Sequence, residues 1–284
     1  MEEKTMRLGM VALKPSASER LAMNVARRWK SGHSKLKPLG RNGYIWLLTV
    51  GMLVAAQASL IWAPKVGIYI NAGALAGLTA IGMLREDARK VAISMAIIPV
   101  ANMISASFIP RGSLGQATVL YISLLLLAVL YRFIFTLEHP VAKTKLTAKG
   151  YALALPLMLV IGQAVGAVGY LFLRNHYPYS GYSLPLVTLV AVVFAFAEEV
   201  TLRGLIQQQG SELFHPAVAA LATTILYVFL SIDHGTMLTL PVAIIMGIVL
   251  SFTYYKKQNL VLTTTINAAA KLAYIGLVAS FILR

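Results

Sequence analysis

The sequence contains no cysteine, so disulfide bonds, thiolate metal ligands and a cysteine nucleophile are excluded within this chain. Charged residues are also scarce: they make up 12% of the 284 residues, and only 10 residues are acidic. Hydrophobic residues reach 58%, well above the roughly 45–50% of an average soluble domain. A soluble fold cannot bury that much apolar surface, which indicates a membrane protein.

Long apolar runs dominate the sequence after residue 43. A membrane-spanning helix needs about 20 mainly apolar residues, and about nine segments meet this criterion. They cover residues 44–63, 67–84, 91–110, 117–136, 151–173, 185–208, 216–233, 238–255 and 260–283. Pro64 and Lys65 predict a tight turn between the first two segments. The predicted fold class is therefore all-α, a polytopic transmembrane bundle of about eight or nine antiparallel helices.

Lys and Arg are unevenly distributed among the connections, which predicts an orientation. Ten of them fall in residues 1–43. If this tail is cytoplasmic, eighteen Lys and Arg lie on the inner side, whereas the outer side receives only Lys65, Arg111, Arg174 and Arg284. We therefore predict an integral protein of the cell membrane with a cytoplasmic N-terminus. The tail is too long and too charged to begin a cleaved signal peptide.

The net charge is +15, and this basic tail holds ten of the 25 Lys and Arg residues. A polybasic segment beside a membrane attracts anionic lipids, so membrane lipid is a predicted partner, although the charge also serves as an orientation signal. Nucleic acid is not a predicted partner, because no aromatic-interleaved nucleic-acid-binding pattern accompanies the charge.

The few ionisable residues inside the apolar segments are the main functional candidates. Each charge at membrane depth costs about 2.5–3.5 kcal/mol on insertion scales. Glu199 and Arg203 are four residues apart, so we predict that they pair on one helix face. Glu198 lies about 100° around the helix from Glu199, and is left to face a cavity, another partner or a proton. It is either a general base, which an apolar site strengthens, or a structural group bound to Lys271 or to hydroxyls.

Two further polar positions lie in the last third of the chain. His234 follows Asp233 at the edge of an apolar segment, where it is either a functional base, ligand or donor, or simply solvated. Asn267 and Lys271 are four apart on one face of the final segment, among small residues that permit close helix packing. The structural alternative is an interhelical hydrogen bond from Asn267 and an ion pair between Lys271 and Glu198.

These motifs resemble the CAAX-protease and bacteriocin-processing (CPBP) family of intramembrane proteases over about residues 150–284. The most specific part is the run from Glu198 to Leu205, which is similar to the family's Glu-Glu-x-x-x-Arg-Gly signature. The resemblance implies that Glu198 activates water while Glu199 and Arg203 support the site. It also divides the chain into a basic tail at 1–43, N-terminal transmembrane helices at 44–149 and a protease-like core at 150–284.

The other family motifs are only partly present. In the second motif, Phe-x-x-x-His, His234 matches, but Leu230 replaces the phenylalanine and Phe229 is displaced by one position. The third motif is His-x-x-x-Asn or His-x-x-x-Asp. Here Asn267 replaces the histidine, and Lys271 replaces the Asn or Asp. The resemblance implies that this motif holds the water or the oxyanion, a role that Asn267 and Lys271 could fill as donors. Alternatively, Lys271 neutralises Glu198 and weakens it as a base.

Three classes of function follow from these residues. The leading prediction is an endopeptidase that cleaves a membrane-associated peptide or protein with Glu198, Glu199 and His234 as catalytic residues and Arg203, Asn267 and Lys271 in support. The alternative is a catalytically inactive scaffold that binds another membrane protein. The third class is a proton-coupled transporter, which the buried carboxylates permit. The sequence does not favour it, because it shows no evident inverted repeats or paired broken helices. One His and two Glu form an incomplete zinc set, so no tightly bound zinc or other cofactor is predicted.

Overall fold

The computed structural model describes residues 41–108, 113–135, 146–173, 181–231 and 239–282. Residues 1–40 of the basic tail, Asp233 and His234 therefore lie outside the described residues, and the last three residues of the predicted tail belong to the first helix. Within these ranges the chain forms helices and no strand, which confirms the predicted all-α class.

The described residues form nine helical runs, whose bounds agree closely with the nine predicted segments. The helices are α2 (Arg41–Trp62), α3 (Pro64–Leu84), α4 (Arg89–Phe108), α5 (Leu114–Ile134), α6 (Ala148–Leu173), α7 (Leu184–Glu198) with the continuous η1 (Glu199–Gln207) and α8 (Gln208–Leu213), α9 (Pro216–Ser231), α10 (Leu240–Lys257) and α11 (Leu260–Ile282). In the described part of the chain, seven runs are long and apolar enough to cross a membrane. The apolar stretches in α2 and α9 are shorter.

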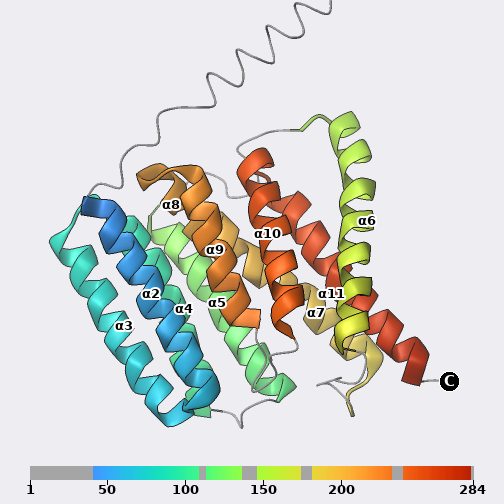
Figure 1. Cartoon of the computed structure of the whole chain (residues 1–284), viewed down its shortest axis with the longest axis horizontal. Coiled ribbons are helices and arrows are strands. Elements are labelled where there is room, and N and C mark those ends of the chain that lie inside the picture. Colours follow the sequence, from blue (N-terminus) through green and yellow to red (C-terminus); the bar gives the residue numbers. More distant parts are fainter. Residues whose placement is uncertain (1–40, 109–112, 136–145, 174–180, 232–238, 283–284) are drawn as a thin grey trace, which may run out of the picture. The chain divides into compact units, whose positions relative to one another are not determined.

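The helices run antiparallel, so their junctions gather at two ends of the bundle (Figure 1). We call the end that holds α8 the α8 end: the α3–α4, α5–α6 and α10–α11 junctions lie there, together with the start of α9. The α2–α3, α4–α5, α6–α7 and α9–α10 junctions lie at the opposite end.

Polar and apolar side chains are distributed as a lipid environment requires. Large apolar side chains such as Leu126, Phe133 and Leu153 are exposed on the outside of the bundle. Glu198, Glu199 and Arg203 are, by contrast, at most 1% exposed. The chain is therefore an integral membrane protein in which these three charged side chains of the membrane-spanning region lie inside the bundle.

Helices α6 and α11 pack with their backbones in close approach. Gly162 and Gly166 of α6 are four residues apart, and a Cβ atom at either position would collide with a backbone oxygen of α11, that of Ile266 or of Ala270. Small residues at such spacing let transmembrane helices approach closely. This contact fixes the half of α11 that carries Asn267 and Lys271.

Candidate active site

The predicted segment 185–208 is not one regular helix. The α-helix ends at Glu198 and continues as a π-helix over Glu199–Gln207, in which every residue is buried. The sequence predicted a helical segment here, which the structure confirms, but its residue spacing did not distinguish a π-helix from an α-helix. π-Helical turns are rare and often occur at functional sites. The two adjacent glutamates stand at the boundary between the two helix types.

Glu198 is held by two donors from α11. Its Oε2 accepts a hydrogen bond from Asn267 Nδ2 at 2.8 Å, and its Oε1 lies 3.1 Å from Lys271 Nζ. The ion pair between Glu198 and Lys271, which the sequence left as the structural alternative, is thus present. The Lys271 side chain is 27% exposed, so it retains access to the space around it.

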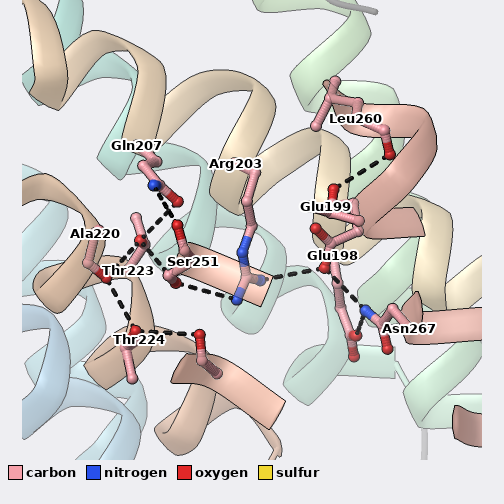
Figure 2. A network of polar contacts seen from close by, with 12 residues as sticks. Glu198, Glu199, Arg203, Gln207, Ala220, Thr223, Thr224, Ser251, Leu260 and Asn267 are labelled. Carbon is pink, nitrogen blue, oxygen red and sulfur yellow. Dashed lines mark hydrogen bonds and ion pairs between the residues drawn. The ribbon is translucent and has the colours of Figure 1, made fainter. Parts of the chain in front are cut away.

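Glu199 points into the protein rather than toward Lys271. Its Oε1 lies 3.3 Å from Arg203 Nη1 and 3.0 Å from Asn267 Nδ2. Both side chains of the Glu199–Arg203 pair are fully buried, which confirms the predicted pairing. Asn267 therefore bridges the two glutamates, as Figure 2 shows for Glu198. The Arg203 guanidinium also lies 4.8 Å from the centre of the Tyr227 ring, a favourable cation–π distance.

A hydroxyl and amide network extends from Arg203, and sequence reasoning missed it. Arg203 Nη2 donates to Ser251 Oγ at 3.4 Å, and Gln207 Nε2 donates to the Ser251 carbonyl at 3.0 Å. Thr223 Oγ1 donates to Gln207 Oε1 at 3.2 Å (Figure 2). The position of Gln207, four residues after Arg203, was a usable signal. Thr223 and Ser251 gave none, because single hydroxyls are ordinary in transmembrane helices.

Glu198 borders a cavity of about 310 Å³. Asn267 and Lys271 line it beside Glu198, and its walls are largely apolar, with Tyr121 and Phe194 stacked at 4.2 Å between ring centres. The Glu198–Lys271 contact therefore does not fill the space next to the carboxylate. A largely apolar cavity with a few convergent polar groups is the usual form of a ligand site.

A row of amide side chains lines the cavity away from Glu198, and it was also missed from the sequence. Gln57 and Asn102 border the cavity, and Gln57 Nε2 lies 3.5 Å from Asn102 Oδ1. Asn102 Nδ2 donates to Asn71 Oδ1 at 3.1 Å, and Asn71 Nδ2 donates to the Gly67 carbonyl at 2.8 Å. Among the described residues nothing bonds the Gln57 carbonyl oxygen, although the side chain is only 6% exposed. The N-terminal helices thus supply polar groups to the cavity.

Not every predicted site residue has a described position. Glu198, Glu199, Arg203, Asn267 and Lys271 come together in one cluster. His234 lies outside the described residues, so its role stays a prediction. The expectation of no tightly bound zinc stays a prediction as well.

Comparison with known proteins agrees with this geometry. Residues 180–273 match the family model described as type II CAAX prenyl endopeptidase Rce1-like. The matched segment contains all five clustered residues, and it confirms the predicted family resemblance over this range. Helices α2 to α6 precede it. No curated protein and no solved structure matches the chain.

Proposed function

Because residues 180–273 are Rce1-like and the chain is an integral membrane protein, we propose that it is an intramembrane endopeptidase that cleaves a membrane-associated protein or peptide with water activated by Glu198. The observation that carries this proposal is the different placement of the two glutamates. Glu198 borders the cavity, whereas Glu199 is locked to Arg203. A general base must reach a water beside the substrate, and Glu198 meets this requirement.

The hydrolysis uses groups already in place. Glu198 takes a proton from a water molecule in the cavity, and the water oxygen attacks the carbonyl carbon of the peptide bond. The resulting oxyanion is stabilised by the Lys271 ammonium, while the two N–H groups of Asn267 hold the carboxylates of Glu198 and Glu199 in place. When the carbon–nitrogen bond breaks, Glu198 returns the proton to the leaving amine. The products are a carboxylic acid and an amine.

Lys271 has two roles in this scheme. In the resting site its ammonium balances the charge of Glu198 at 3.1 Å. When the oxyanion forms beside Glu198, Glu198 has become a neutral acid and the ammonium shifts toward the new negative charge. This shift is short because both groups border the same cavity.

A second candidate function is a catalytically inactive scaffold that binds another membrane protein. The direct Glu198–Lys271 ion pair favours it, because a neighbouring cation weakens a carboxylate as a base. Asn267 and Lys271 would then form a structural network with Glu198, Glu199 and Arg203, and the cavity would hold a peptide without cleaving it.

The two functions are separated by a cleavage assay. Protein reconstituted in liposomes is incubated with a peptide library, and new termini are identified by mass spectrometry. We expect cleavage by the wild type, a loss of about 10²–10⁴-fold for Glu198→Gln, and no change for the control Glu86→Gln, whose carboxylate is an exposed partner of Arg89. Full activity of Glu198→Gln contradicts the proposed mechanism. An inactive wild type together with an active Lys271→Asn variant establishes the scaffold.

A further inference from the structure

Most of the cavity lies toward one end of the bundle. The larger part of its lining comes from the later turns of α2, α4, α6 and α9 and the early turns of α5 and α10, toward the end opposite the α8 end, and the rest comes from α7 and the middle of α11. On the continuous run that begins with α7, Glu198 is the lining residue farthest from that opposite end. Glu198 is the fifteenth residue of α7, which places it about 20 Å along the helix from its start.

The half of the bundle toward the α8 end is filled by side chains. Leu202, Leu205 and Leu250 are all 0% exposed and lie beyond Glu198 in this direction. Arg203 is equally buried beneath the Tyr227 ring. Among the described side chains, then, the passage to Glu198 lies on the side away from the α8 end.

Among the described residues at the helix junctions, Lys and Arg are concentrated at the α8 end. Arg85 and Arg89 at the α3–α4 junction, Lys149 at the start of α6 and Lys256 and Lys257 at the end of α10 all belong to it. In the part of the chain that the structure describes, the junctions at the opposite end carry only Lys65. Loops rich in Lys and Arg remain on the cytoplasmic side of a membrane.

From these two asymmetries we infer that the cavity opens toward the non-cytoplasmic side of the membrane and receives a peptide segment presented from that side. Exported polypeptides and outer loops of membrane proteins belong to this substrate class. Prenylated tails held at the cytoplasmic surface do not, because they would have to pass the filled half of the bundle to reach Glu198. The cleavage of this segment rests on the proposed function, whereas the side on which the cavity opens does not.

The absence of cysteine makes the side directly measurable. Single cysteines are introduced as Lys65→Cys at the cavity end and Lys257→Cys at the α8 end, and both native lysines are exposed. Ala106→Cys reports on the cavity itself, since Ala106 lines it and is partly exposed. Intact cells that express each variant are treated with a membrane-impermeant thiol reagent, before and after permeabilisation. Wild-type protein, which carries no thiol, gives the background.

We expect Lys65→Cys and Ala106→Cys to be labelled in intact cells, and Lys257→Cys only after permeabilisation. The reverse pattern, or labelling of both Lys65→Cys and Lys257→Cys in intact cells, overturns the inference. Because labelling requires no catalysis, its outcome is independent of the cleavage assay. A correct labelling pattern with no cleavage by the wild type therefore rejects the proposed enzyme and leaves the cavity orientation standing.

Discussion

Gln57 illustrates how a single buried amide gains significance from its surroundings. It is 6% exposed, borders the cavity, and is linked through Asn102 and Asn71 to the backbone of α3. Its carbonyl oxygen has no hydrogen-bond partner in the described structure, so it is available to accept from a peptide N–H.

Replacement of Gln57 by leucine is therefore expected to weaken substrate binding rather than the chemical step. The loss of one hydrogen bond of about 0.5–1.5 kcal/mol predicts a rise in KM of about two- to tenfold with kcat little changed. The matched control is Gln209→Leu, which removes a buried glutamine that does not border the cavity. A fall in kcat at constant KM contradicts a binding role for Gln57.

Residue spacing alone predicted one of the site's contacts and left others open. The Glu199–Arg203 pair follows from two charges four apart in an apolar run, and it is present at 3.3 Å. The partner of Glu198 could only be named among alternatives, because Lys271 reaches it from another helix. Gln57 and Asn102 were missed for the same reason: each is an isolated amide whose neighbour lies 45 residues away in the chain.

At the scale of helices, the contact between α6 and α11 determines where the α11 donors stand. Gly166 faces the carbonyl of Ala270, which is one residue before Lys271, and Gly162 faces the backbone beside Asn267. Any side chain at these positions pushes the two helices apart. The consequence is a longer distance from Asn267 and Lys271 to Glu198.

The variant Gly166→Val is expected to lower both the melting temperature and the cleavage rate. Overpacking in a close contact costs about 1–3 kcal/mol, and displacement of the donors reduces transition-state stabilisation further. Gly276→Val is the control, because a Cβ atom at Gly276 meets nothing within 4 Å. Thermal unfolding in detergent and the cleavage assay measure the two effects. Equal behaviour of both variants shows that the α6–α11 contact does not position the site.

The π-helix shows what sequence patterns do not contain at this scale. The run from Glu199 to Gln207 lies in a segment that was predicted as helical, and its residue spacing does not distinguish a π-helix from an α-helix. Its altered pitch accompanies contacts to Ser251 and Asn267, which belong to α10 and α11. Local sequence cannot specify a geometry that depends on these distant partners.

For the whole molecule, the sequence predicted the helices well and their packing hardly at all. The helix bounds agree with the apolar segments because each segment must satisfy its backbone hydrogen bonds within the membrane, which leaves few choices. The arrangement of the described helices depends on side-chain fit, which periodicity does not encode. The charges at the site are balanced: Glu199 pairs with Arg203, and Glu198 pairs with Lys271.

This balance leads to a prediction about metal dependence. A divalent ion at Glu198 would have to displace the Lys271 ammonium and the Asn267 amide, and it would add uncompensated positive charge at membrane depth. Cleavage by the wild type is therefore expected to survive dialysis against EDTA and 1,10-phenanthroline without loss, as measured by initial rates before and after treatment. A known zinc protease treated in parallel confirms that the chelators act. If activity disappears and returns with added zinc, the clustered residues together with His234 form a metal site and the ammonium does not occupy it during turnover.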